Sequence, residues 1–195
     1  MAETILLWAF CYLLGCIPFG ILVARINKVN LREHGSGNIG ATNVSRVLGK
    51  KTGLMTLAGD LSKGLAAVVI ASRLLDSHWQ IAVAGLMAFT GHVYPVFLKF
   101  KGGKGVATGL GIFLFLMPVA TVSAMGVFAV TLWASAYVSL GSVLASLLLP
   151  IFGIFYQYPP EFMAVSVIVA LIVLHKHTEN MQRILDGKES RFLKK

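Results

Sequence analysis

Long apolar runs, each about the length of one membrane crossing, dominate the pattern of hydrophobic and polar positions along the chain. The first three runs are residues 4–24, 52–72 and 77–98. A helix that crosses a bilayer needs roughly 20 apolar residues, because each residue rises about 1.5 Å along a hydrocarbon core of about 30 Å. Each of these runs therefore predicts one membrane-spanning helix.

A fourth apolar region follows, and it is longer than one helix. Residues 105–160 carry no charged side chain, and apolar sequence resumes after Glu161 until His175. Proline and glycine predict turns or helix starts at Pro118, the Gly141 region, Pro150 and the Tyr158–Glu161 segment. The last helix is expected to continue into the C-terminal tail.

The basic residues predict how the chain is oriented in the membrane. Residues 25–51 hold six Lys and Arg, residues 99–104 hold three and residues 175–195 hold six, which together are fifteen of the 17. The positive-inside rule places these segments in the cytoplasm, so the N-terminus lies outside, the C-terminus lies inside and the number of crossings is odd. We therefore expect one all-α integral membrane domain over residues 1–195, with seven spans and five as the alternative.

The composition excludes several other classes of protein. Hydrophobic residues make up 56% of the chain, charged residues 13%, and the mean hydropathy is +0.78. Such a chain is far too apolar for a soluble domain. The net charge of +9 does not indicate nucleic acid as a partner, since the basic residues lie between apolar runs. Cys11 and Cys16 fall inside the first run and read as packing residues, so no metal and no cofactor are expected.

The first basic segment contains a group of small and polar residues that could bind an anion. It reads HGSGNIGATN over residues 34–43, and Arg46 follows three positions later. Glycine lets backbone N–H groups converge on an oxyanion, hydroxyls and amides add donors, and a guanidinium adds a bidentate pair. The candidate phosphate ligands are Gly35, Ser36, Gly37, Asn38, Thr42, Asn43 and Arg46. A flexible connector is the alternative, and this segment alone does not decide between them.

A second candidate anion site follows the third apolar run. The sequence KFKGGKG occupies residues 99–105, and an apolar helix is expected to begin at Val106. This places Gly102, Gly103, Lys104 and Gly105 at a helix N-terminus, where backbone N–H groups and the helix dipole attract phosphate. A basic turn set by the positive-inside rule would explain the lysines, but not the three glycines around one of them.

A third group of polar residues lies at the inner end of the last apolar run. His177 and Asn180 are three positions apart and so share a helix face, with Arg183 and Glu189 following. The alternative is that His177 marks the membrane interface and that Asn180 caps a helix.

Two further pairs of polar residues lie inside apolar runs. Asp60 and Lys63 predict a structural ion pair that faces the helix bundle, because an unpaired charge is costly there. Ser139 and Ser142 share a helix face and indicate helix packing, with a contact from Ser142 to a substrate hydroxyl as the second choice.

The three motifs together resemble the bacterial acyl-phosphate:glycerol-3-phosphate acyltransferase family. The resemblance is carried by GSGNIGATN with Arg46, by GHVYPVFLKFKGGKGVAT over residues 91–108, and by His177, Asn180 and Glu189, in the order of that family. It covers nearly the whole chain, although Lys176 and Thr178 depart mildly from the pattern around the histidine.

The resemblance implies a seven-helix enzyme of the bacterial plasma membrane whose active site faces the cytoplasm. Such an enzyme moves an acyl group from acyl phosphate to the 1-position of glycerol 3-phosphate and makes lysophosphatidic acid. The resemblance also implies that Ser36 and Arg46 are required and that Gly102–Gly105 bind glycerol 3-phosphate. It further implies functional roles for His177 and Asn180 and a structural role for Glu189. Membrane lipids are further partners, and a monomer is compatible with the sequence, which leaves the oligomeric state open.

Acyl phosphate is a mixed anhydride with a good leaving group, so we expect positioning of the attacking hydroxyl to supply much of the rate acceleration. The first motif is expected to hold the acyl phosphate, while Lys104, Arg46, His177 and Asn180 hold glycerol 3-phosphate. Either His177 or the substrate phosphate takes the proton. A covalent acyl-Ser36 is the rival mechanism. A transporter of a phosphorylated metabolite is the alternative function, although no inverted repeat is apparent.

Overall fold

In the computed structural model, which describes residues 1–192, the chain folds into helices joined by short loops, and these residues contain no β-strand. Within residues 1–192, five helical segments are long and apolar enough to cross a membrane, and they are Ala2–Ile26, Lys50–Leu74, His78–Leu98, Pro118–Ser135 and Val138–Phe155. The bent pair Pro160–Lys176 and Thr178–Leu185 makes a sixth if it is one span. The predicted all-α class is therefore confirmed, and the first three predicted runs each coincide with one segment.

The chain divides into two compact units, residues 1–115 and residues 116–195, which are described separately below. The prediction of one domain over residues 1–195 remains a prediction, and its last three residues, 193–195, lie outside the described part of the chain. Two of the fifteen basic residues that predict the orientation, Lys194 and Lys195, also lie outside the described part of the chain.

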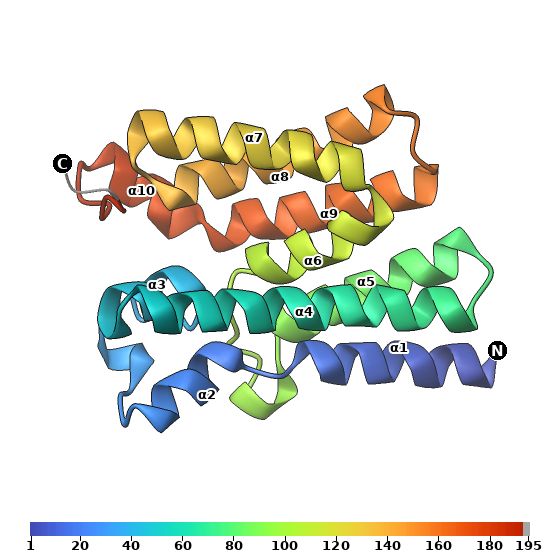
Figure 1. Ribbon diagram of the computed structural model, residues 1–195, viewed down its shortest axis with the longest axis horizontal. Helices are drawn as coiled ribbons and strands as arrows, with labels where there is room; N and C mark the ends of the chain where they lie inside the picture. The colour runs from blue at the N-terminus through green and yellow to red at the C-terminus, as the bar shows by residue number, and fades with distance from the viewer. Residues whose placement is uncertain (193–195) are drawn as a thin grey trace. The chain divides into compact units, whose positions relative to one another are not determined.

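In the first unit, helices α1 (Ala2–Gly15), α4 (Lys50–Leu74) and α5 (His78–Val93) pack side by side, as Figure 1 shows. Glycine lets their backbones approach closely. A Cβ added at Gly15 would overlap the carbonyl of Ala88, and one added at Gly91 would overlap the carbonyl of Tyr12. Small residues at such contacts are typical of membrane helices, which associate through close packing rather than through exclusion of water.

The first apolar run is broken, although the sequence predicts one continuous helix. Helix α1 ends at Gly15 and α2 (Phe19–Ile26) begins after Pro18, which has no backbone N–H to continue the hydrogen-bond ladder. The break leaves the carbonyl of Ile17 without a helical partner, and the side-chain Nζ of Lys63 donates to it over 2.7 Å. The predicted ion pair partner of that lysine, Asp60, lies one turn away in α4.

Two shorter helices complete the first unit. Helix α3 (Ala41–Leu48) packs on α4, and α6 (Val106–Leu116) begins at the predicted position. Four helices lie between Lys104 and Lys176, as the seven-span prediction requires. However, α6 has only 11 residues. At about 1.5 Å per residue it is about 16 Å long, which is shorter than a hydrocarbon core of about 30 Å. The count of seven spans therefore remains a prediction.

In the second unit, α8 (Val138–Phe155) packs against both α7 (Pro118–Ser135) and α9 (Pro160–Lys176), as seen in Figure 1. Pro118 and Pro160 begin helices as predicted. The turns predicted at Gly141 and Pro150 are wrong, because both residues lie inside α8. The chain instead turns just before α8, where Ala136 is left-handed with φ 61°.

The last helix is also not continuous. Helix α9 ends at Lys176 and α10 (Thr178–Leu185) begins two residues later, with a bend of 51° between the two axes. His177 stands at this break, where it ends one helix and begins the next. The last helix thus continues into the tail as expected, but with a break at His177 that the sequence did not predict.

Candidate active site

The first loop, residues 34–43, follows a 3-10 turn, η1 (Leu31–Glu33), and leads into α3. Its backbone is ordered by one buried side chain, that of Asn43, which is 2% exposed. The Oδ1 atom of Asn43 accepts from the backbone N–H of Ser36 over 2.9 Å. Its Nδ2 atom donates to the carbonyls of Asn38 at 2.8 Å, His34 at 3.1 Å and Leu31 at 3.5 Å. The amide thus holds the two ends of the loop together.

Two glycines let the first loop turn around Asn43. Gly35 and Gly37 are left-handed, with φ 62° and 70°. This conformation costs residues other than glycine energy. A Cβ added at Gly35 would also overlap Oδ1 of Asn43. Ser36 lies between the two glycines and its side chain is exposed. The loop therefore uses buried groups for its own order and presents the Ser36 hydroxyl outward.

The remaining polar residues predicted for this loop lie on either side of it. Asn38 is half-buried in the loop, and its carbonyl accepts from Asn43. Thr42 and Arg46 are one helical turn apart on α3, so they share a face, where Thr42 is half-buried and Arg46 is exposed. The structure thus places three of the predicted site residues, Ser36, Thr42 and Arg46, in one segment of the first unit.

The second loop, residues 99–105, follows a 3-10 turn, η2 (Val96–Leu98), and ends where α6 begins. Its course is unusual, because Lys99, Phe100 and Gly105 are left-handed, with φ 53°, 60° and 83°. The backbone N–H of Gly102 donates to the carbonyl of Val93, and that of Gly103 donates to the carbonyl of His92, both over 3.2 Å. These bonds tie the loop to the end of α5.

The two loops are connected to each other. The Nη2 atom of Arg32, which lies in η1 just before the first loop, donates to the carbonyl of Lys101 in the second loop over 2.7 Å. Lys104 is half-buried and stands two residues before the first residue of α6. The segments that carry the two motifs are therefore in contact within the first unit, which the sequence suggested only by their common side of the membrane.

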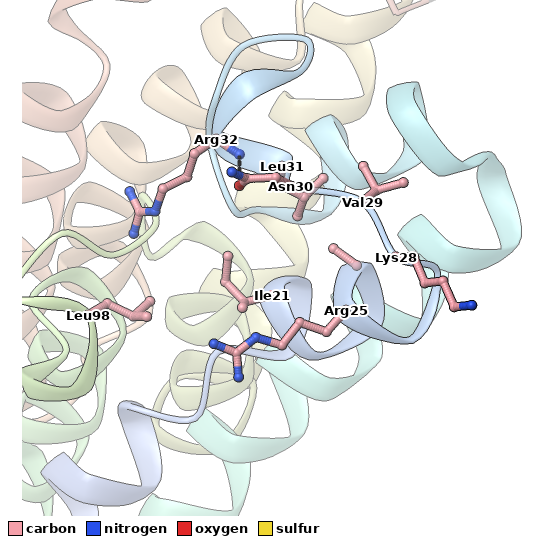
Figure 2. A pocket seen from close by; sticks show the side chains of 9 residues that line it. Ile21, Arg25, Lys28, Val29, Asn30, Leu31, Arg32 and Leu98 are labelled. Carbon is pink, nitrogen blue, oxygen red and sulfur yellow. Dashed lines mark hydrogen bonds between the residues drawn. The ribbon is translucent and has the colours of Figure 1, made fainter.

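A pocket of about 450 Å³ opens beside η1 in the first unit. Figure 2 shows Arg25 and Arg32 among the residues that line it, with Ile21 between them, Leu98 to the left and Lys28 to the right. None of the predicted site residues lines this pocket. Basic side chains beside apolar ones are what the positive-inside rule predicts where a span ends. We therefore do not assign this pocket to the reaction.

In the second unit, His177 is buried at the break between α9 and α10, with 4% of its surface exposed. Its Nδ1 atom lies 2.8 Å from the carbonyl of Val173. A carbonyl only accepts hydrogen bonds, so Nδ1 carries the proton of this bond. In the neutral ring Nε2 then keeps a lone pair, which is the form required to accept a proton from a hydroxyl.

Asn180 is held by a group of polar side chains that we call the Glu189 cluster, namely Ser139, Asn180, Arg183 and Glu189. The Oε1 atom of Glu189 accepts from Oγ of Ser139 over 2.8 Å and from Nδ2 of Asn180 over 2.6 Å. Its Oε2 atom accepts from Nε of Arg183 over 2.8 Å. Burial raises the pKa of Glu189, but the hydrogen bonds from Asn180, Arg183 and Ser139 outweigh it, and the net pKa is lowered.

Ser142, the second-choice contact to a substrate hydroxyl, lies in α8. It is 3% exposed, and its hydroxyl donates to the carbonyl of Val138 over 2.8 Å, within its own helix. Its helix neighbour Ser139 instead reaches across to Glu189. The shared face predicted for these two serines is present, while binding of substrate by Ser142 remains a prediction.

Sequence reasoning missed one residue beside the site, His92. It lies in the last turn of α5, is 5% exposed, and contacts both the Asp60–Lys63 pair and the second loop. The signal that could have found it is its position, since an ionisable residue inside a membrane span is by default a candidate for function. The predicted pair itself is present, with Nζ of Lys63 2.8 Å from Oδ1 of Asp60.

Comparison with known proteins identifies the family. The sequence model described as glycerol-3-phosphate acyltransferase matches residues 5–187. The glycerol-3-phosphate acyltransferase of Geobacter metallireducens is 52% identical over 192 residues, which cover 98% of this chain and 99% of the relative. That of Syntrophotalea carbinolica is 47% identical over 194 residues, with coverage of 98% and 99%.

Two crystal structures of PlsY (YgiH), an integral membrane glycerol 3-phosphate acyltransferase, share the fold. The glycerol 3-phosphate form has a TM-score of 0.94 and 39% identity, and covers 98% of this chain and 96% of its own. The lysophosphatidic acid form has a TM-score of 0.89 and 38% identity, with coverage of 97% and 95%. The present chain is therefore an integral, multi-pass membrane acyltransferase. It belongs to the glycerol-3-phosphate acyltransferase family, which confirms the resemblance carried by its three motifs.

Proposed function

We propose that this enzyme transfers an acyl group from acyl phosphate to the 1-hydroxyl of glycerol 3-phosphate. The hydroxyl oxygen attacks the carbonyl carbon, and the new ester bond forms as the bond from that carbon to the phosphate oxygen breaks. The hydroxyl proton goes to a base, and inorganic phosphate leaves. The products are lysophosphatidic acid and phosphate, and the step balances without a redox partner.

The single observation that best supports this proposal is the connection of the two glycine-rich loops within one unit, through the 2.7 Å bond from Arg32 to the carbonyl of Lys101. The reaction has two phosphate-bearing substrates, and the unit offers two candidate phosphate sites. The crystal structures of the related PlsY are its glycerol 3-phosphate form and its lysophosphatidic acid form, which supports the same acceptor and product for this chain.

We assign the donor to the first loop. The exposed hydroxyl of Ser36, supported by left-handed glycines on both sides, can donate to an oxygen of the phosphate or to the carbonyl oxygen that gains charge during attack. Thr42 and Asn38 can add hydrogen bonds. Asn43 acts through the loop, because its amide is engaged with backbone groups of that loop.

We assign the phosphate of glycerol 3-phosphate to Lys104 with Arg46, and the N-terminus of α6 supplies a favourable dipole for the same anion. In the second unit, Asn180 is oriented by Glu189, and His177 has the protonation pattern of an acceptor at Nε2. We propose that these two residues act on the acceptor, with His177 or the substrate phosphate taking the proton.

We further propose that the chain lies in the bacterial plasma membrane with all three motifs in the cytoplasm. The proposal rests on the fifteen Lys and Arg residues that gather on one predicted side. Single cysteines introduced at Ser36 or Lys104 should react with an impermeant thiol reagent only after the membrane is opened. Cys11 and Cys16 are buried and provide a low background. Labelling from the outside of intact cells would reverse the orientation.

The decisive experiment offers the purified protein three donors separately, namely acyl phosphate, acyl-CoA and acyl carrier protein, each with glycerol 3-phosphate. Turnover with acyl phosphate alone supports the proposal. Turnover that requires one of the two thioesters would contradict the donor assignment. The same protein in liposomes, tested for uptake of labelled glycerol 3-phosphate, separates acyl transfer from transport, because a transporter would accumulate the label without forming lysophosphatidic acid.

A further inference from the structure

Three ionisable side chains meet inside the membrane-spanning part of the first unit. Asp60 and Lys63 come from α4 and His92 comes from α5, and they are 2%, 3% and 5% exposed. The Oδ1 atom of Asp60 lies 2.8 Å from Nζ of Lys63 and 3.4 Å from Nδ1 of His92. Both distances lie within the range of an ion pair, but neither contact is an aligned hydrogen bond to Oδ1. Below, these three residues are called the buried cluster.

Two members of the buried cluster have a structural explanation. Lys63 donates to the carbonyl of Ile17, which the break before Pro18 leaves without a helical partner. Asp60 balances the charge of Lys63, and a mutual pair makes both charges tolerable inside a membrane. The pair is already neutral, so neither the helix break nor the charge balance requires a histidine at position 92.

The other side of His92 faces the second loop. Its backbone carbonyl accepts from the N–H of Gly103 over 3.2 Å. A Cβ added at Gly103 would overlap Nε2 of the imidazole, and one added at Gly102 would overlap the carbonyl of His92. Gly103 is therefore packed on the imidazole itself, while Gly102 is packed on the carbonyl of His92 and also on Val93 and Pro95. Lys104 is the next residue along the chain.

We propose that His92, oriented by Asp60, is a positioning residue that sets the backbone of Gly102 and Gly103 and thereby aims Lys104 at the phosphate of glycerol 3-phosphate. One ring nitrogen lies 3.4 Å from the carboxylate of Asp60, and the other faces Gly103 of the loop. This inference deepens the assignment of glycerol 3-phosphate to Lys104 and rests on it. It predicts that His92 controls binding of the acceptor rather than the chemical step.

The first test measures KM and kcat for His92→Ala and Asp60→Asn. We expect His92→Ala to raise the KM for glycerol 3-phosphate about tenfold, with the kcat and the KM for acyl phosphate changed less than about threefold, because a displaced Lys104 weakens the ground state and transition state alike. Asp60→Asn should raise the same KM by a smaller factor. An unchanged KM in a folded His92→Ala enzyme, or a loss of kcat alone, would overturn the inference.

A double-mutant cycle distinguishes positioning from general packing. Gly103→Ala should raise the KM for glycerol 3-phosphate strongly, because its methyl group overlaps the imidazole. In the His92→Ala background that overlap is removed, so the same change should raise the KM by a several-fold smaller factor. Gly126→Ala is the matched control, since an added Cβ at that position in α7 meets no atom within 4 Å. An equal rise in KM on Gly103→Ala in both backgrounds would show that the His92 side chain does not position the loop.

A binding measurement separates failure of this inference from failure of the proposed function. The thermal unfolding midpoint of the full chain in detergent is measured as glycerol 3-phosphate is added. If the wild type is not stabilised, the acceptor assignment itself fails. If the wild type is stabilised and His92→Ala responds at the same ligand concentrations, only the positioning role of His92 fails. A shift of the response to about tenfold higher concentration in His92→Ala supports both.

Discussion

The first loop and the Glu189 cluster each order a candidate catalytic residue, but they do so with different chemistry. In the first loop a neutral amide, Asn43, bonds to backbone groups while left-handed glycines make the turn. In the Glu189 cluster a carboxylate collects three side-chain donors, among them Asn180 and Arg183. The amide has no charge to lose, so the comparison predicts that acid weakens the second arrangement and spares the first.

The largest effect is expected at the residue that the first loop presents. Ser36→Ala removes the hydroxyl that we propose donates to the acyl phosphate, so the rate should fall about 30-fold to 1000-fold, which corresponds to about 2–4 kcal/mol of transition-state stabilisation. Steady-state kinetics with acyl phosphate measure it, and residual turnover should remain. Covalent labelling of Ser36 by radioactive acyl phosphate in the absence of glycerol 3-phosphate would show instead that Ser36 is the nucleophile.

The next effect concerns the second loop. Lys104→Ala should raise the KM for glycerol 3-phosphate about tenfold to 100-fold with a smaller change in kcat, because a charge-assisted bond to phosphate is present in both the ground state and the transition state. Initial rates at varied acceptor concentration measure it. Lys99→Ala is the control, since that lysine is exposed at the start of the same loop. A KM that stays at the wild-type value would remove Lys104 from the site.

A smaller loss is expected for the residue that orders the first loop. Asn43→Ala removes four hydrogen bonds to backbone groups. Ser36 should then lose its fixed position and activity should fall about tenfold, with a lower unfolding temperature. Asn27→Ala is a matched control, because Asn27 is exposed and bonds within its own helix end. If both variants behave alike, the amide does not order the loop.

The smallest effect at neutral pH is expected for Glu189→Gln, which keeps an acceptor but loses the charge that pairs with Arg183, a side chain that is 37% exposed. Activity should change less than about fivefold, as for a partly exposed pair. Acid should reveal the difference between the two arrangements. The pKa of Glu189 is lower in the folded protein than its ordinary 4.5, so the stabilisation is present above that value and is lost as the pH falls through the folded pKa.

The measurement is the unfolding temperature from about pH 6 to about pH 3 in the wild type, Glu189→Gln and Glu179→Gln. The unfolding temperature of the wild type should exceed that of Glu189→Gln at the upper end of this window, and the difference should shrink as the pH falls. Glu179 is 91% exposed and contacts Arg183 at 3.8 Å, so it serves as the control for an exposed pair with the same arginine and should follow the wild type. A constant difference between wild type and Glu189→Gln across the window would show that the charge of Glu189 does not stabilise the cluster.

Much of the fold could be read from the sequence, because the bilayer imposes simple length and composition rules. The positions of the first three spans, the helix starts at Pro118 and Pro160 and the start of α6 all follow from local sequence. The errors arose where local rules have exceptions inside membranes. Pro150 lies within α8, since neighbouring groups can satisfy the backbone that a proline leaves open. His177 interrupts the last helix although the apolar pattern continues up to it.

The sequence by itself determined the class of protein and the family motifs, since hydropathy, basic loops and glycine-rich segments are properties of neighbouring residues. Only the tertiary structure decided which of those residues are engaged with other groups of the protein and so order their neighbours. Asn43 is engaged with its own loop, Glu189 orders Asn180, and His92 lies behind Gly103. These relations join residues that are not neighbours in the sequence, and their energies depend on distances that no local pattern specifies.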